Sequence, residues 1–208
     1  MAKAVTSPGD NRLAGLIADM MHKVQHGGIT CDHIALFNQG KNPYPKEDNK
    51  TTSHLKLISG GHVLSLPATD GKRTIAQAGD LFTGYIDPDY VNWGLDVSQA
   101  SVPAMSVDVF EQTLDGTFAN IFDGVGRSYD SMAHTQNQIV VFCEKHRDWL
   151  PTEGYGTFFL FKEDRKFFVA KVRFDDARRL YVDVHPLSDD DVWNARFRYR
   201  FVLPQLPV

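Results

Sequence analysis

Four side chains that bind transition metals lie within twelve residues near the start of the chain: His22, His26, Cys31 and His33. The first two would share one face of a helix, and the last two would share one face of a strand. Imidazole and thiolate are ligands that suit tetrahedral zinc, so the cluster predicts a zinc site and, with it, a metalloprotein or metalloenzyme. The alternative is structural, because histidines suit the last turn of a helix and a strand cysteine often packs in a core.

A second thiol and imidazole lie three residues apart on a predicted helix, at Cys143 and His146. Such a pair is the centre of many thiol nucleophiles. Both residues share the apolar face of the helix with Phe142 and Trp149, and a buried thiol is inert. We therefore expect packing here rather than catalysis.

An acidic loop carries Asp87, Asp89 and Asn92. Carboxylates two residues apart can bind calcium, but the full calcium loop has more oxygen ligands and a closing glutamate. The alternative is a turn stabilised by aspartate side chains. The three aspartates at 189–191 are expected to form a solvated turn or a helix N-terminus. The loop also holds three aromatic residues that suit either a ligand platform or core anchors: Tyr85, Tyr90 and Trp93.

The surface that we favour lies in the C-terminal quarter of the chain. Residues 195–201 alternate apolar or aromatic side chains with three arginines, and residues 168–174 alternate apolar side chains with other residues that include Lys171 and Arg173. Alternate residues of a strand point to opposite faces, so one face would be basic. A basic sheet with aromatic side chains can hold a nucleic-acid backbone and stack bases. The alternative is an ordinary solvated face whose charges pair across strands, for example with Asp183. The predicted face consists of Lys171, Arg173, Tyr181, His185, Arg196, Arg198 and Arg200.

Capping and breaking residues delimit the elements of the N-terminal part. A helix is predicted over residues 10–26 and a strand over residues 29–37, followed by an exposed polar loop over residues 38–53. Two apolar runs at 55–58 and 62–66 flank Gly60-Gly61, which predicts a β-hairpin. Further strands are expected at 81–86 and 106–112, and a short helix around Phe118–Phe122.

A second main helix is predicted from Thr135, which forms a capping box with Gln138, to the residues before Pro151. Strands are predicted at 157–161, 166–174, 180–185 and 195–203, and short polar turns favour an antiparallel meander. The expected fold is α+β: a curved antiparallel sheet or partial barrel packed by the two main helices, in one domain over residues 1–208.

Composition places the chain among ordinary globular proteins, with 42% hydrophobic and 23% charged residues. The net charge of −4 argues against strong general binding to nucleic acid, although residues 162–208 hold ten basic and eight acidic side chains. Two cysteines do not make a disulfide framework, and we find no signal peptide and no apolar run long enough to cross a membrane. A cytoplasmic protein with free thiols is expected.

Several blocks resemble a family of uncharacterised bacterial proteins over roughly residues 54–205. They are 58–62, 67–71, 85–94 and the helix 135–150 with Lys145-His146-Arg147. The resemblance implies a bacterial cytoplasmic setting and no known activity. Residues 60–86, with Ala78-Gly79-Asp80, are also similar to the middle of a cupin barrel. The cupin metal motif would supply two histidines one residue apart, whereas here His54 stands alone.

The function that we expect is therefore a non-enzymatic binding protein that uses the basic sheet face toward nucleic acid or an acidic partner, without a cofactor. The alternative is a zinc protein or metalloenzyme that uses the N-terminal cluster. Motifs of serine hydrolases, phosphate-binding loops and dinucleotide folds are absent from the sequence. The sequence does not separate a core phenylalanine from an interface phenylalanine, so it leaves homo-oligomers open.

Overall fold

The computed structural model describes residues 53–151 and 155–205. Residues 51–208 form one compact unit, divided from residues 1–50, and the single domain over residues 1–208 stays a prediction. The predicted helix at 10–26, the strand at 29–37 and the loop at 38–53, apart from Ser53, lie outside the described residues.

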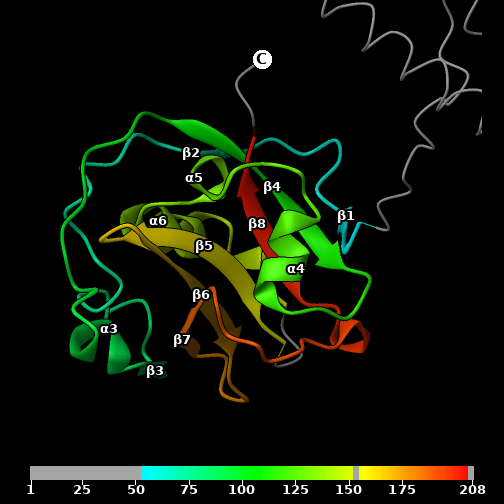
Figure 1. The fold of residues 1–208 in the computed structure, drawn as a ribbon. Coiled ribbons are helices and arrows are strands. Elements are labelled where there is room, and N and C mark those ends of the chain that lie inside the picture. The colour runs from blue at the N-terminus through cyan, green and yellow to red at the C-terminus, as the bar shows by residue number, and fades with distance from the viewer. Residues whose placement is uncertain (1–52, 152–154, 206–208) are drawn as a thin grey trace, which may run out of the picture. The chain divides into compact units, whose positions relative to one another are not determined.

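Among the described residues, eight strands form one open sheet (Figure 1). Its strands are β1 (Leu55–Leu57), β2 (Leu64–Leu66), β3 (Tyr85–Ile86), β4 (Met105–Gln112), β5 (Thr157–Glu163), β6 (Lys166–Phe174), β7 (Leu180–Pro186) and β8 (Arg200–Pro204). The strand order is β1-β4-β8-β5-β6-β7-β3, and β2 also pairs with β4. The α-helices are α3 (Asp89–Asn92), α4 (Phe118–Asp123), α5 (Tyr129–Met132) and α6 (Gln136–Lys145), and the 3-10 helices are η1 (Arg147–Trp149) and η2 (Ala195–Phe197).

The α+β class is confirmed, but the sheet is mixed rather than purely antiparallel. The predicted meander is present, because β5 pairs antiparallel with β6 and β6 pairs antiparallel with β7. Two neighbouring pairs are parallel: β5 with β8, and β3 with β7. The described strands do not close into the barrel that the similarity to cupins implied.

The predicted hairpin around Gly60-Gly61 is wrong. β1 and β2 both pair with β4, Leu57 opposite Phe110 and Leu64 opposite Val107, so they lie in line along one strand. The Ser59 hydroxyl accepts a hydrogen bond from the backbone N–H of Val109 at 2.9 Å. This bond satisfies a donor of β4 where the edge strand is interrupted.

The predicted strand 195–203 is also wrong in its first half. Residues 195–197 form η2, and the Asn194 side chain accepts a hydrogen bond from the backbone N–H of Arg196. Arg198 then adopts a left-handed conformation with φ of 51°. Of the predicted strand, only residues 200–203 belong to a strand of the sheet, β8, which lies between β4 and β5.

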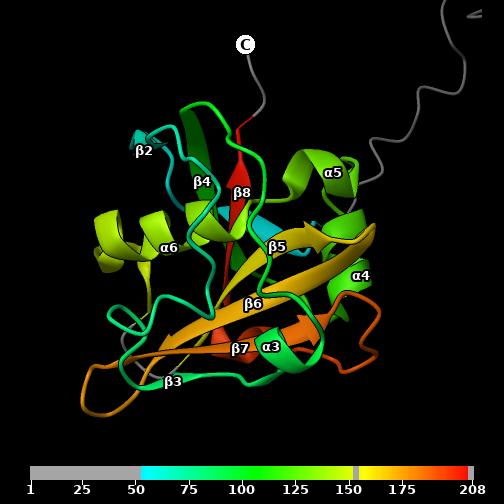
Figure 2. The ribbon, with the colours of Figure 1, turned by 90° about the vertical axis from the view of Figure 1, so that its left-hand side faces the viewer.

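Both faces of the sheet are covered by apolar side chains. α6 packs on one face, where Ile139 and Phe142 join a core with Phe159 and Val172. α4 and α5 supply the core of the other face, which includes Phe158. Figure 2 shows α6 on one side of β4 and β8 and α4 on the other. The sheet is therefore the middle layer, and only parts of each face reach solvent.

The start of α6 confirms the predicted capping box, in which the Thr135 hydroxyl accepts from the backbone N–H of Gln138 and the Gln138 side chain accepts from that of Thr135. The helix ends at Lys145, short of the predicted end, and η1 follows. Among the described residues, no helix has the length and apolar character needed to span a membrane.

Candidate functional site

The side chains of β6 divide between the two faces as the alternation predicts. Phe168, Ala170, Val172 and Phe174 belong to the core under α6. Lys171 lies opposite Phe158 of the other core, so Lys171 and Arg173 project to the face that α4 covers in part.

The neighbouring strand β7 adds polar side chains to the same face. Lys171 pairs in register with Asp183, and Arg173 pairs with Tyr181. The Arg173 guanidinium lies 4.7 Å from the centre of the Tyr181 ring, and its Nε is 3.5 Å from a carboxylate oxygen of Asp183. His185 is on this face too, with its Nδ1 3.4 Å from a carboxylate oxygen of Asp189. Four of the seven predicted residues therefore share a surface: Lys171, Arg173, Tyr181 and His185. Asp183 forms an ion pair with Arg173 on the neighbouring strand, as the alternative predicted.

The three arginines at 196–200 do not form the predicted row. Arg200 pairs with Thr157, which precedes Phe158, so it projects to the opposite face and donates to the carbonyl oxygen of Trp149 at 2.5 Å. Arg198 forms an ion pair with Glu111 at 3.0 Å. Only Arg196 stays with the site, because η2 places its guanidinium 4.6 Å from the centre of the Phe197 ring. The break in the strand is the physical reason, since alternation holds only in extended backbone.

Aromatic rings connect these cations across the sheet. The Lys171 amine lies 5.0 Å from the centre of the Trp193 ring, and the Trp193 and Tyr199 centroids are 5.3 Å apart. Tyr155 lies 6.5 Å from Tyr199 and 5.5 Å from Phe197. At the other end, Tyr85 stacks on Tyr181 with centroids 5.8 Å apart. We name this surface the aromatic–basic strip and define it as Tyr85, Tyr155, Lys171, Arg173, Tyr181, Trp193, Arg196, Phe197 and Tyr199.

Two glycines make room for the strip. A Cβ at Gly156 would lie 2.9 Å from Cγ of Lys171, so the lysine stem crosses bare backbone there. A Cβ at Gly84 would lie 2.1 Å from the Tyr181 ring. Distances below 3.0 Å are not reached by real Cβ atoms, and glycine is the residue that permits such close approach.

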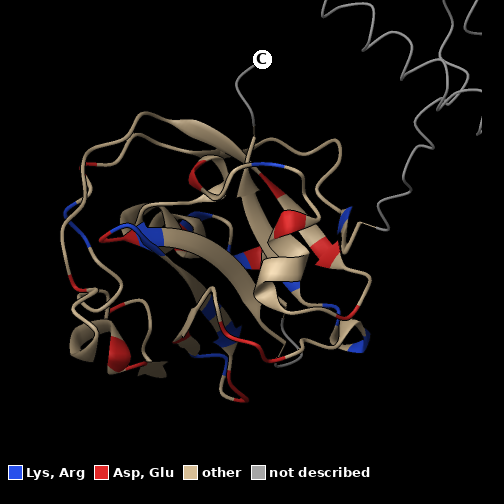
Figure 3. Ribbon diagram, in the orientation of Figure 1, with Lys and Arg blue, Asp and Glu red and all other residues tan. Residues whose placement is uncertain are grey.

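The electrostatics of the strip are those of a weakly basic surface. Burial lowers the pKa of Lys171, which Asp183 opposes and Arg173 reinforces. Burial also raises the pKa of Tyr199. The described basic and acidic residues stand next to one another on several elements rather than gathering on one (Figure 3). Any anion held here would therefore be held by few charges, at short range.

The other candidate residues that lie within the described part of the chain have structural roles, as the alternatives in the sequence analysis predict. Cys143 is fully buried, and the Nε2 atom of His146 lies 3.1 Å from the carbonyl oxygen of Ser65. The Asp87 carboxylate accepts hydrogen bonds from the backbone N–H groups of Asp89 and Val184, so it stabilises the turn that leads into α3 and ties that turn to β7.

The aromatic residues of that loop divide by exposure. Tyr90 is a buried core anchor, whereas Tyr85 and Trp93 are exposed. The carboxylates of residues 189–191 lie within 4.8 Å of one another. Asp189 also accepts from the backbone N–H of Asp191, which is the turn that the sequence predicts. The four predicted zinc ligands lie outside the described residues, so the zinc site stays a prediction.

Sequence reasoning missed the residue at the centre of the strip. Trp193 follows the acidic turn in an irregular segment, and a backbone bridge to Gly116 holds it over the sheet. Periodicity carries no signal for such a residue, because its position depends on a contact between segments far apart in the chain. The alternation along residues 195–201 predicts Phe197 and Tyr199 on the face opposite to the three arginines, but the 3-10 helix at residues 195–197 interrupts this alternation.

The comparisons with known proteins add no relative. No family model, no curated protein and no solved structure matches the chain. The resemblance to uncharacterised bacterial proteins accordingly stays a prediction.

Proposed function

We propose that the aromatic–basic strip binds single-stranded nucleic acid. The observation that carries the proposal is the alternation of rings and cations on one sheet face, from Tyr85 and Arg173 through Lys171 and Trp193 to Arg196. Cations that follow a phosphate backbone, next to rings on which bases stack, are the features by which proteins bind single strands without reading sequence. An acidic protein partner would need the cations but not the rings.

The proposal is for a binding role, because the strip offers stacking surfaces and cations rather than an assembled catalytic set. Duplex nucleic acid should bind more weakly than a single strand, because its bases are already stacked on one another and cannot occupy the tyrosine and tryptophan faces. The low number of cations also sets the salt dependence. Three phosphate contacts predict a slope of log K against log salt of about −2 for a single strand.

The test is fluorescence anisotropy with a labelled 15-nucleotide single strand and the matching duplex, at two salt concentrations. Tyr85→Ala should weaken single-strand binding by about 1–3 kcal/mol, because Tyr85 is exposed and its removal takes away one stacking surface. Arg173→Ala should reduce the salt slope by about 0.7. Lys56→Gln is the control, since Lys56 is exposed on β1, which stands at the other end of the strand order from β3 and its Tyr85.

Absence of saturable binding at low salt would end the proposal, and so would equal binding by the parent and both strip variants. Binding of poly-glutamate that depends on Arg173 but not on Tyr85 would point to an acidic protein partner instead. Metal analysis of the untagged full chain tests the predicted zinc site separately, because its ligands do not belong to the strip.

A further inference from the structure

A carboxylate stands among the cations of the aromatic–basic strip. Asp183 pairs in register with Lys171, and by the alternation along β7 it projects to the same face as Tyr181. A surface that held phosphates alone would be weakened by this charge, because a carboxylate repels a phosphate at close range. The position of Asp183 therefore favours the part of a nucleotide that donates hydrogen bonds, which is the base.

The Asp183 carboxylate has acceptor capacity that the fold does not use. Its one hydrogen bond among the described residues comes from Nε of Arg173, at 3.5 Å. This distance is longer than the usual range of about 2.7–3.2 Å, and an ionised carboxylate can accept about four hydrogen bonds. The side chain of Asp183 is 22% exposed, so a ligand can reach it. Both oxygens are therefore open to the N–H groups of a base.

Arg173 supplies hydrogen-bond donors next to these acceptors. A guanidinium has several N–H donors, and among the described residues only the Nε of Arg173 is engaged by a hydrogen bond. The same guanidinium lies 4.7 Å from the centre of the Tyr181 ring, so it is held between the carboxylate and an aromatic face. Acceptors and donors thus stand side by side on the surface where bases would stack.

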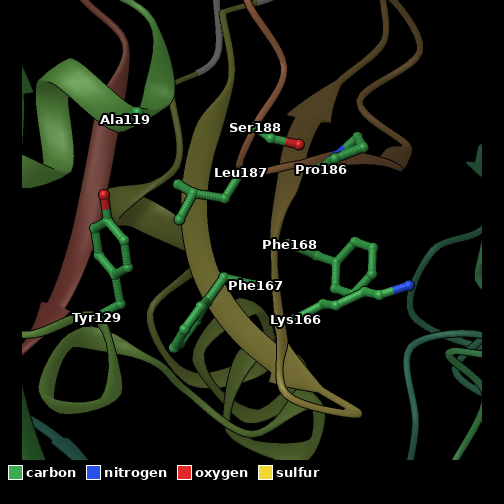
Figure 4. A pocket seen from close by; sticks show the side chains of 8 residues that line it. All are labelled: Ala119, Tyr129, Lys166, Phe167, Phe168, Pro186, Leu187 and Ser188. Carbon is green, nitrogen blue, oxygen red and sulfur yellow. The ribbon is translucent and has the colours of Figure 1, made fainter.

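Among the described residues, no carboxylate lines the cavity at the end of β7 (Figure 4). The cavity has a volume of about 410 Å³, in the range of small-molecule sites. Tyr129 and Phe167 lie on one side of Leu187, and Lys166 and Ser188 lie on the other. A base against the apolar wall of Tyr129 and Phe167 would leave the polar atoms of its edge unpaired, which costs free energy. The strip is therefore the better place for a base.

We propose that Asp183 makes one position of the bound single strand specific for guanine. Its carboxylate accepts hydrogen bonds from N1–H and the 2-amino group of the base, and Arg173 donates to O6. Guanine is the base that presents two adjacent N–H donors on its Watson–Crick edge, and a single strand leaves that edge free. On each of the other bases the donor stands next to an acceptor, which repels the second carboxylate oxygen. This inference rests on the proposed function and adds a base preference to it.

The test is fluorescence anisotropy with the full chain and three labelled 15-nucleotide DNA strands. Each repeats two thymines and a third base, which is guanine, adenine or hypoxanthine. A bidentate contact predicts that the guanine strand binds at least about fivefold more tightly than the adenine strand. Hypoxanthine lacks the 2-amino group, so its strand should bind with an affinity between the other two. Equal binding of the guanine strand and either other strand would overturn this inference and leave the proposed function intact, whereas no saturable binding of any strand at low salt would end both.

The variant Asp183→Asn locates the base preference. It replaces an acceptor oxygen by a donor, so the guanine and adenine strands should bind within about twofold of each other. Binding of the adenine strand should not weaken, because a charge that repels phosphate has gone. Asp164→Asn is the matched control and should keep the preference, since Asp164 is exposed in the turn between β5 and β6.

A guanine preference that persists in Asp183→Asn would overturn the inference. A thermal melt checks that this variant folds. If it does not fold, the comparison of the guanine and hypoxanthine strands on the parent protein decides, because it removes one hydrogen bond from the ligand and leaves the protein unchanged.

Discussion

His134 should make the stability of this protein depend on pH between 7 and 4. His134 is 4% exposed, and its Nε2 atom lies 3.0 Å from the carbonyl oxygen of Val202. Burial lowers the pKa of His134 from 6.5 to about 4, partly opposed by the Val202 hydrogen bond and reinforced by Arg127. Its Nδ1 atom is buried and has no partner among the described residues.

The sign and size of the effect follow from this lowered pKa. As the pH falls from 6.5 toward 4, the unfolded chain takes up a proton on His134 that the folded protein does not, so the free energy of unfolding falls. The stabilisation by the neutral ring is complete above pH 6.5 and is lost as the pH falls through 4. The fall in pKa from 6.5 to about 4 corresponds to a loss of about 3 kcal/mol.

The substitution His134→Gln isolates the contribution of His134 to the pH dependence of the free energy of unfolding. Its amide N–H can still reach the Val202 carbonyl oxygen, but it does not titrate. Urea denaturation at pH 7, 6, 5 and 4 should show the parent losing about 3 kcal/mol more than His134→Gln, because other acidic groups contribute equally to both proteins. His146→Gln is the matched control, because it also replaces an imidazole whose Nε2 atom lies near a backbone carbonyl oxygen, that of Ser65. Equal pH dependence of the parent and His134→Gln would refute the reasoning.

Three further predictions concern packing. Gly84→Ala should displace the Tyr181 ring and cost roughly 1–3 kcal/mol in thermal or urea unfolding, whereas Gly79→Ala, whose Cβ would meet nothing within 4 Å, should avoid that steric clash. Thr135→Ala should cost about 1 kcal/mol in urea unfolding by removing the hydroxyl that caps α6, and Thr135→Ser should restore most of it. Burial raises the pKa of the Cys143 thiol, so this thiol should resist a thiol reagent in the native protein and react once the protein unfolds. Fast labelling of a native variant that lacks the other cysteine would contradict the burial of Cys143.

The parts of the fold that the sequence predicted are those that local interactions decide. The capping box at Thr135 joins groups three residues apart, so its residue types are enough to place the start of α6. The alternation along residues 166–174 assigns Lys171 and Val172 to opposite faces because the backbone there is extended throughout. The short polar turns of the meander connect neighbouring strands and so predict their antiparallel pairing.

The parts that failed depend on partners far away in the chain. The glycines at 60 and 61 favour a local hairpin, but residues 55–57 and 64–66 each pair with β4 instead. In doing so the two segments supply hydrogen-bond partners for the backbone groups of β4. Residues 195–203 alternate as a strand would, but the Asn194 cap and the left-handed Arg198 bend the chain before it enters the sheet.

The sequence by itself thus determined the class of the fold, the capped helix and the basic side chains of β6, because short-range periodicity and capping encode them. Only the tertiary structure decided which rings accompany those cations. Trp193 reaches Lys171 through a backbone bridge to Gly116, and Arg200 leaves the surface because its register with Thr157 turns it to the other face. These positions result from long-range pairing, whose energy is shared among many residues and leaves no pattern along the chain.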